Sequence, residues 1–477
     1  MRILLVKPQA RLATVRGLEA FQLLEPIELG YLAAAVGDDH TVRILDLRLH
    51  RRADRAFAAA LARFRPDVVG FTGYSHEASA VKALAAAVRS ALPDAFIAVG
   101  GHHATVAPDD LNVTQIDAVI RGEGCGPFRA LVDALADGGD VAGIPHVLEP
   151  GDRWDADAVT TWPTFPDPAT LPVPRRDLWD PASYRSVWAA EQMPAWERIF
   201  PAVSMVRASW GCRMKCTFCV VPFLCGGEHR PRPADWVANE IADAPADHIY
   251  FCDDENFIDE GFALELADAL ERRGVRKRYF AWTRATTVLR SPELFRRWRA
   301  IGLDAAFLGF EFTDDATLRE HKKATSVRAN EQALDRLREL GIAVHAAFML
   351  QPEFTEAQFA GLRDYVRKLP PAQCSFTVCT PSPGTPDYEA TRTDMWVDNP
   401  YDLHDCMHPL TPTALPLRRF TELYAEQVAE GVRKTPLRAN HHPLRPGDLW
   451  RVVRAERRYL RGYRRLYEDY PQELWRT

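Results

Sequence analysis

The sequence has no unbroken apolar run near the roughly 18 residues that a membrane-spanning helix needs, although hydrophobic residues make up 47 % of its 477 positions. The apolar start, Met1 to Val6, is too short for a secretory signal and is followed at once by Lys7 and Pro8. A formal net charge of −6 and a pI near 6.2 give no reason to expect nucleic acid as a partner. We therefore expect a cytoplasmic protein of two or three domains, at roughly 150 residues each.

Cysteine is sparse, with nine in the chain, which fits a reducing compartment better than a disulfide framework. The exception is the stretch Cys212-Arg-Met-Lys-Cys216-Thr-Phe-Cys219, spaced C-x3-C-x2-C. Thiolates are the ligands of iron–sulfur clusters, and three of them without an obvious fourth predict a four-iron cluster with one open iron. The alternatives are three structural thiols or a zinc site, which Cys225 and His229 could complete.

With Phe218 just before its last cysteine, this motif resembles the signature loop of the radical S-adenosylmethionine (SAM) enzymes. The resemblance implies that Cys212, Cys216 and Cys219 hold a [4Fe-4S] cluster and that Phe218 helps to bind the cofactor. It also implies that the open iron chelates the amino and carboxylate groups of SAM. An electron from the cluster then cleaves SAM to methionine and a 5′-deoxyadenosyl radical.

Apolar runs alternate with amphipathic stretches over residues 1–145, which predicts an α/β, Rossmann-like domain with a parallel sheet. We expect strands at residues 2–6, 41–45, 67–72, 95–99 and 117–121, and helices at residues 27–36, 53–64, 78–92 and 126–135. Ligands of such sheets bind at the carboxyl ends of the strands, where polar and glycine-rich turns fall in this sequence.

Residues 68–135 resemble the cobalamin-binding domain that precedes the radical SAM domain in one large subclass. The resemblance implies that three turns line the corrinoid: Tyr74, Ser75, Gly100, Gly101, His102, Gly122, Glu123 and Gly124. The D-x-H-x-x-G motif of many other cobalamin proteins is missing, because Asp46 and His50 have the wrong spacing, so the lower cobalt ligand is unassigned. A degenerate domain kept as a scaffold is the alternative.

Residues 146–200 hold many prolines and predict a surface linker. Its aromatic end, residues 178–200, favours an interdomain seam over a pocket for a bulky apolar substrate. Residues 201–400 predict a partial (β/α)6 barrel of the TIM type, which would be the radical SAM domain. Its expected strands are residues 203–208, 248–252, 279–284, 306–311, 344–349 and 375–379, and its helices residues 236–242, 261–273, 292–301, 330–340 and 356–368.

Active groups of such barrels lie at the C-terminal ends of the strands, which singles out Asp253, Asp254, Arg284 and Glu311. Acids and a base together suit a zwitterionic ligand with ribose hydroxyls. By resemblance, the acidic turn at Asp253 faces the SAM amino group, and Arg284 and Glu311 hold its carboxylate and ribose. The alternative is that some of these residues pair with each other or cap helices. The glycine-rich turn that many members carry after the fifth strand is absent.

Residues 401–477 predict a helical C-terminal region. His404, Cys406 and His408 fall within five residues, and a solvated loop is favoured there over a metal site. Seven arginines lie among apolar residues from Arg451 to Arg465. A solvated helix surface is favoured for them, and weak docking to anionic lipid headgroups is the functional alternative, which would make the protein peripheral to the inner membrane.

As a whole, the chain resembles the cobalamin-dependent radical SAM methyltransferases. Segments similar to the hopanoid C-3 methylases are residues 25–29, 253–257, 273–279 and 296–302. The resemblance implies that one SAM methylates cobalamin, while the radical from a second SAM takes hydrogen from an unactivated carbon, which then receives the methyl group of methylcobalamin. It implies a small-molecule substrate, with a hopanoid as one candidate, and a reductant protein such as flavodoxin or ferredoxin. The alternatives are a radical cyclase or rearrangement enzyme, an aminocarboxypropyl transferase, and a non-enzymatic corrinoid or zinc module.

Overall fold

The computed structural model describes residues 1–151, 165–193, 195–435 and 443–475. These residues form two compact units. Unit 1 comprises residues 1–11 and 26–183, and unit 2 comprises residues 12–25 and 184–477. No helix within these ranges combines the length and the apolar character that crossing a membrane requires.

Unit 1 is built on a six-stranded sheet with the strand order β3-β1-β4-β5-β6-β7. Its first five strands run parallel, and β7 pairs antiparallel with β6. The strands are β1 (Arg2–Lys7), β3 (Thr41–Asp46), β4 (Val68–Thr72), β5 (Phe96–Gly100), β6 (Ala118–Ile120) and β7 (Val147–Leu148).

Helices cover both faces of this sheet, because successive residues of each strand point to opposite sides. Ile3 and Leu5 share one buried core with α2 (Ile27–Ala35) and α6 (Cys125–Ala136). Leu4 and Val6 belong to the opposite core, which contains α3 (Ala53–Phe64) and α4 (Ala78–Ala91). The Rossmann-like architecture predicted for this part of the chain is therefore confirmed.

Unit 2 contains a second six-stranded sheet, in which all strands are parallel and each strand lies beside its neighbour in sequence. The strands are β9 (Val203–Val206), β12 (His248–Phe251), β13 (Arg278–Thr283), β14 (Leu303–Glu311), β15 (Ala343–Leu350) and β16 (Gln373–Val378). The helices between them are α9 (Ala234–Asp243), α10 (Glu260–Arg272), α11 (Ala285–Arg290), α12 (Pro292–Ile301), α13 (Asp315–Glu320), α14 (Val327–Glu339) and α15 (Glu356–Lys368). This arrangement is the predicted partial (β/α)6 barrel.

The segment that follows β8 (Arg185–Ser186) closes the end of the barrel at which the strands begin. Strand β8 itself pairs with β2 (Gln22–Leu23). The indole of Trp188 is buried there and donates from Nε1 to Asp304 at 2.9 Å. Asp304 also pairs with Arg278. We call this polar layer of Trp188, Arg278 and Asp304 the floor of the barrel.

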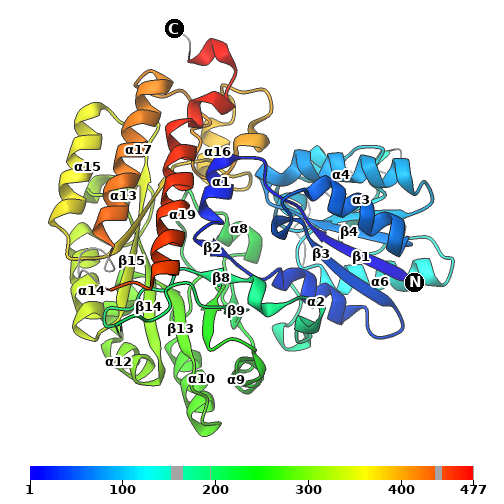
Figure 1. Cartoon of the computed structure of the whole chain (residues 1–477), viewed down its shortest axis with the longest axis horizontal. Coiled ribbons are helices and arrows are strands. Elements are labelled where there is room, and N and C mark those ends of the chain that lie inside the picture. Colours follow the sequence, from blue (N-terminus) through cyan, green and yellow to red (C-terminus); the bar gives the residue numbers. More distant parts are fainter. Residues whose placement is uncertain (152–164, 194, 436–442, 476–477) are drawn as a thin grey trace. The chain divides into compact units, whose positions relative to one another are not determined.

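The C-terminal helices cover one side of unit 2 (Figure 1). Helix α17 (Leu417–Lys434) packs on β16 and α15, and α19 (Pro446–Arg464) lies beside α17. The N-terminal helix α1 (Ala13–Leu18) lies against α19. A Cβ at Gly17 would lie 3.0 Å from Tyr459 Cα, and a Cβ at Gly462 would lie 3.1 Å from the Ala13 carbonyl oxygen. The helical C-terminal region is therefore confirmed.

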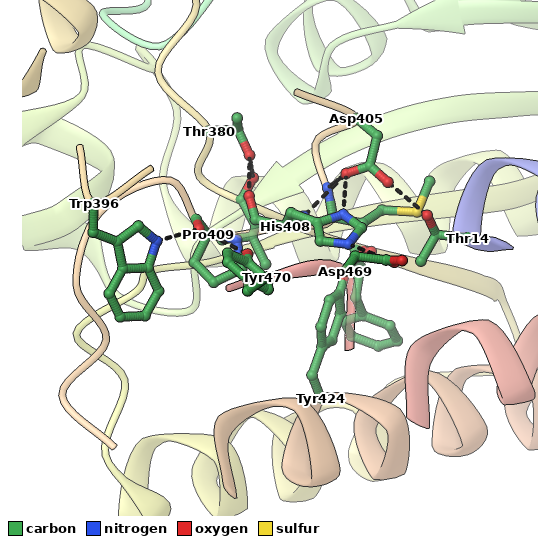
Figure 2. Close-up of polar contacts among 12 residues, drawn as sticks. Thr14, Thr380, Trp396, Asp405, His408, Pro409, Tyr424, Asp469 and Tyr470 are labelled. Carbon is green, nitrogen blue, oxygen red and sulfur yellow. Dashed lines mark hydrogen bonds and ion pairs between the residues drawn. The ribbon is translucent and has the colours of Figure 1, made fainter. Parts of the chain in front are cut away.

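The loop around His408 is not solvated, so that prediction was wrong. The His408 side chain is fully buried, with Nδ1 2.9 Å from Asp405 Oδ1 and Nε2 3.2 Å from Asp469 Oδ2 (Figure 2). His404 is buried as well, with Nε2 2.9 Å from the Pro381 carbonyl oxygen. Only Cys406 of the three is exposed. The imidazoles are held by carboxylates and a carbonyl group, so their role in this loop is structural.

Candidate functional site

The cysteine loop leaves β9 and is closed at its base by the antiparallel pair β10 (Ser209–Trp210) and β11 (Arg230–Pro231). Gly211 begins the loop with a φ of +87°, and a Cβ there would lie 2.0 Å from the Glu228 carbonyl oxygen. Only glycine fits this crossing of the two loop arms. The loop therefore starts from a rigid base at the C-terminal end of β9.

Two carboxylates at the end of β12 fasten the same base. Asp253 accepts from the Ala208 amide at 2.9 Å and from Ser209 Oγ at 2.6 Å, and Asp254 accepts from the Gly211 amide at 2.8 Å. Burial raises the pKa of Asp253 to about 7. Both oxygens of Asp253 are thus engaged by the chain's own donors, so its visible contacts position the cysteine loop.

Further contacts hold the far side of the loop. The Thr217 amide donates to the His321 carbonyl oxygen at 3.1 Å, and Thr217 Oγ1 lies 3.0 Å from His321 Nδ1. Gly384 belongs to the turn Pro381-Ser-Pro-Gly-Thr385, which follows β16. It has a φ of +87° and lies so close to Phe223 that a Cβ would approach its ring to 2.5 Å. The turn and the cysteine loop are therefore packed together.

The three predicted ligands are free thiols, with Cys212 and Cys216 buried and Cys219 half-buried. Burial raises the pKa of Cys219 to about 12 and that of Cys212 above its usual range. Cys216 is near enough to both to raise their pKa values further. Burial thus disfavours the thiolate forms of these cysteines unless a cation lies beside them. A cationic iron centre supplies this charge and stabilises the deprotonated form. Across the described residues, no three His, Cys, Asp or Glu side chains are placed to chelate a single metal ion.

Lys323 links Arg284 and Glu311 beside this loop, and no signal in the sequence singled out this lysine. Arg284 Nη1 lies 3.7 Å from Cys216 Sγ, and its Nη2 donates to the Lys323 carbonyl oxygen. Lys323 Nζ donates to Glu311 Oε1 at 2.5 Å and lies 6.0 Å from the centre of the Phe218 ring. The structure thus brings Phe218, Arg284 and Glu311 together around a buried lysine.

The backbone at this place is unusual. Glu311, Lys322 and Ala324 have φ values of +61°, +51° and +53°. Residues other than glycine rarely adopt this left-handed backbone region. Such conformations cost roughly 1–3 kcal/mol each and cluster at functional sites. The backbone is therefore strained at Glu311 itself and at the two residues that flank Lys323.

Glu255, in the acidic turn after β12, is a second residue that strand-end reasoning passed over. It is 1 % exposed, and its Oε1 accepts from Thr283 Oγ1 at 3.0 Å. Its Oε2 has no hydrogen-bond partner in the described part of the chain. Burial raises the pKa of this carboxyl group to about 7, although the nearby Arg284 lowers it. Its position inside the acidic turn was the signal that could have identified it.

In unit 1, the three predicted cobalamin turns lie at one edge of the sheet, because β4, β5 and β6 are neighbours. Tyr74 is 53 % exposed, with the His102 ring 5.6 Å away and Lys7 Nζ 5.1 Å from its centre. The Tyr74 amide donates to Glu77 Oε2 at 2.9 Å. An exposed aromatic flanked by a histidine and a lysine offers a surface on which a flat polar ligand can lie.

Hydrogen bonds between the turns fix their backbones. Ser75 Oγ lies 3.1 Å from Nδ1 of buried His103, whose Nε2 lies 2.9 Å from Asp110 Oδ2. Another link runs from Gly101 to Gly122, since Thr105 Oγ1 donates to the Gly101 carbonyl oxygen at 2.8 Å and accepts from the Gly122 amide at 3.0 Å. The predicted turns are therefore rigid.

The remaining predicted residues of this edge begin or end elements. Gly100 is the last residue of β5. Glu123 accepts from the Cys125 amide at 3.0 Å, and Gly124 directly precedes α6. Burial raises the pKa of Glu123 above its usual range. Asp46, whose spacing to His50 departs from the cobalt-ligand motif, pairs with Arg48 at 2.6 Å.

We expect Gly101→Ala to weaken cobalamin binding about tenfold or more, a loss of at least ~1.4 kcal/mol. Gly101 has a φ of +94°, and a Cβ there would lie 2.5 Å from Thr72 Oγ1, so the turn between β5 and α5 (His102–Val106) must shift. An absorbance titration with hydroxocobalamin measures the change. Gly126→Ala is the control, because its Cβ meets no atom within 4 Å. Equal affinity of Gly101→Ala and wild type would contradict the placement of this turn at the corrinoid.

Two family models match the chain. The B12 binding domain matches residues 13–132, and the radical SAM superfamily matches residues 208–366. The chain is 30 % identical to the hopanoid C-3 methylase of Methylococcus capsulatus over 425 residues, which are 88 % of this chain and 78 % of that protein. It is 25 % identical to the anaerobic magnesium-protoporphyrin IX monomethyl ester cyclase of Rubrivivax gelatinosus over 377 residues, 75 % of this chain and 64 % of that enzyme.

Among solved structures, the fold is similar to that of the radical SAM methyltransferase TsrM from Kitasatospora setae with cobalamin and a [4Fe-4S] cluster bound, with a TM-score of 0.65 and 18 % identity over 98 % of this chain and 99 % of that one. Radical SAM enzymes act on small molecules and need a reductant. The thiols of the cysteine loop and the turns at the edge of the unit 1 sheet fit the cofactors of such an enzyme. The chain therefore belongs to the cobalamin-dependent radical SAM methyltransferases, the family that includes the hopanoid C-3 methylase.

Proposed function

We propose that this enzyme methylates an unactivated carbon of an apolar small molecule, with a hopanoid as the first candidate. The proposal rests on the aromatic side chains of the inner face of the barrel sheet, which is the face that the helices do not cover. Tyr250, Phe280, Trp282 and Phe307 lie on it in mutual ring contact. The cysteine loop follows β9 on the strand-end side of the same sheet. The 30 % identity to a hopanoid methylase supports the same substrate class.

The cluster and SAM belong to the cysteine loop in this proposal. Cys212, Cys216 and Cys219 hold the cluster, and Asp253 and Asp254 hold the loop base. Phe218, Arg284 and Glu311 contact SAM, with Lys323 fixing Glu311. Glu255 Oε2, which has no hydrogen-bond partner in the described residues, is suited to the ammonium group. When bound, the cluster supplies the electron that cleaves SAM to a 5′-deoxyadenosyl radical, and cobalamin supplies the methyl group.

Cobalamin belongs to the edge of the unit 1 sheet. Tyr74, Ser75 and His102 contact it beside the turns Gly100–Gly101 and Gly122–Glu123–Gly124. The proposed division is residues 1–145 for cobalamin, 146–200 as linker, 201–400 for the radical SAM chemistry and 401–477 as the helical end. It is modified at two places, because residues 12–25 fold with unit 2 and β7 (Val147–Leu148) adds a strand to the sheet of unit 1. A flavodoxin or ferredoxin supplies electrons. All nine cysteines are free thiols, which suits a cytoplasmic enzyme.

The proposed reaction is tested with SAM carrying a trideuterated methyl group. The reconstituted enzyme, cobalamin, a strong reductant and a hopanoid are incubated without oxygen, and products are analysed by mass spectrometry. Methylation exchanges one hydrogen for one trideuteromethyl group and releases 5′-deoxyadenosine. A product that has lost hydrogen without gaining the label would show a cyclase, and transfer of the aminocarboxypropyl group would show the third alternative. Absence of deoxyadenosine under every condition would contradict radical chemistry.

Weak contact with an anionic membrane surface is a further part of the proposal, and α19 supports it. Leu449 is 51 % and Trp450 63 % exposed on this helix. Arginines are exposed along the rest of it: Arg451, Arg454, Arg457, Arg458, Arg461 and Arg464. An aromatic residue beside arginines is typical of helices that lie at a lipid interface.

We expect the full-length enzyme to sediment with phosphatidylglycerol vesicles and not with phosphatidylcholine vesicles. Replacing Arg454, Arg457 and Arg461 by Gln should weaken binding about 100-fold, at about 1 kcal/mol for each basic residue. Arg336→Gln, an exposed arginine of α14 paired with Glu339, is the control. Binding that does not respond to salt or to the triple substitution would contradict docking through α19.

A further inference from the structure

The inner face of the barrel sheet contains one imidazole among its aromatic side chains. Along β15, Val344, Ala346 and Phe348 belong to the core beneath the helices, so His345, between the first two, points the other way. The His345 ring lies 4.9 Å from the Phe307 ring and 6.5 Å from the Phe280 ring. The residue as a whole is half-buried on this face.

One ring nitrogen of His345, Nε2, is buried and has no hydrogen-bond partner within the described ranges of the chain. Burial alone lowers the pKa of His345 to about 4, so the imidazole is neutral at physiological pH. A buried nitrogen without a partner costs roughly 1–3 kcal/mol, and native proteins seldom keep such a group without a reason.

His248 is also a half-buried histidine of this sheet, but its surroundings differ from those of His345. His248 lies at the start of β12, and its ring packs edge-on against Trp188 at 4.8 Å. Burial lowers its pKa to about 4 as well, yet its ring lies against Trp188 of the floor and its ring nitrogens are not among the unsatisfied buried atoms. His345 lies further along the strands than the floor residues, next to Phe307 in register.

We propose that the aromatic inner face of the barrel binds the apolar body of the substrate and that His345 is a positioning residue, whose Nε2 forms a hydrogen bond with a neutral hydroxyl or carbonyl group of that substrate. The inference rests on the proposed function and deepens it by naming the polar group that the substrate must carry. A neutral imidazole can donate or accept at Nε2 according to its tautomer, so both groups fit. A charged group does not, since burial disfavours a charge beside this imidazole.

The position of His345 also sets the geometry of the substrate. It lies five residues before Leu350, the last residue of β15, which is about 16 Å along a strand at ~3.3 Å per residue. SAM and the cluster belong to the strand ends. The polar group that His345 binds is therefore far from the carbon that reacts, and the substrate is an elongated, largely apolar molecule with its polar group at the distant end.

The test compares two probes that differ by one hydroxyl group, trans-2-decalol and trans-decalin. Their binding to the full-length, reconstituted enzyme with SAM and cobalamin is measured by calorimetry. We expect wild type to bind decalol about tenfold more tightly, which corresponds to one hydrogen bond of ~1.4 kcal/mol. His345→Phe should bind both probes alike, and His345→Gln should keep part of the preference. His248→Phe is the matched control and should keep all of it.

Equal binding of the two probes by wild type, or an unchanged preference in His345→Phe, would overturn the hydrogen bond. Failure of wild type to bind either probe would overturn the apolar site itself. Because this measurement needs no turnover, it is separate from the test of methyl transfer. If the enzyme methylates its substrate but shows no preference for decalol, the proposed function stands and this inference is wrong.

Discussion

Cys216→Ala is expected to abolish formation of 5′-deoxyadenosine, a loss of at least about 1,000-fold, while cobalamin binding stays unchanged. Three thiolates and SAM complete the coordination of a four-iron cluster in this family, so removing one ligand leaves an iron exposed. Cys216 Sγ also lies 3.7 Å from Arg284 Nη1. Iron and sulfide content, and deoxyadenosine released after reduction without oxygen, measure the effect.

Cys225→Ala is the matched control for this experiment. Cys225 is a buried free thiol at the end of α8 (Val221–Cys225), in the same loop, and burial raises its pKa to about 12. We expect this variant to keep its iron and to form deoxyadenosine at the wild-type rate. If Cys225→Ala lost iron and Cys216→Ala kept it, the ligand assignment from the C-x3-C-x2-C spacing would be wrong. Zinc in place of iron in wild-type protein purified without oxygen would also contradict it.

The repeating parts of the fold could be predicted because their signals are local. A parallel strand buried on both faces is a short apolar run, and α3 is predicted and observed over the same residues, 53 to 64. The cysteine loop carries its own spacing. These signals depend on neighbouring residues in sequence, so a single sequence is enough to find them.

Contacts between distant segments carry no such signal. Residues 12–25 lie inside the sequence of the first domain and fold with unit 2, where α1 packs on α19. Lys323 lies in the turn after α13, and nothing in its sequence surroundings shows that it will bind Glu311 and Arg284. His345 is one of fourteen histidines, and only the register with Phe307 shows its aromatic surroundings.

The His408 network is the clearest case of this kind and leads to the second large effect. Asp405 accepts from His408 and, through Oδ2, from Thr14 Oγ1 at 2.6 Å (Figure 2). It thus joins α1, the loop after β16 and the C-terminal turn that contains Asp469. Breaking a buried ion pair by removing one partner costs about 3–5 kcal/mol. We expect His408→Leu to lower the free energy of unfolding of unit 2 by this amount, measured by urea denaturation.

The same network predicts how stability depends on pH. Burial on its own lowers the pKa of His408, but Asp405 and Asp469 raise it to about 9, above the value near 6.5 of an unfolded chain. Stabilisation by the charged imidazole is therefore complete below pH ~6.5 and is lost as pH rises through about 9, a change on the order of 3 kcal/mol. The difference in unfolding free energy between wild type and His408→Leu should shrink over this interval. Thr14→Val, which removes one hydrogen bond and no charge, should show a difference that is constant with pH. A wild-type advantage over His408→Leu that is equally large at pH 6 and pH 10 would mean that His408 is neutral in the folded protein.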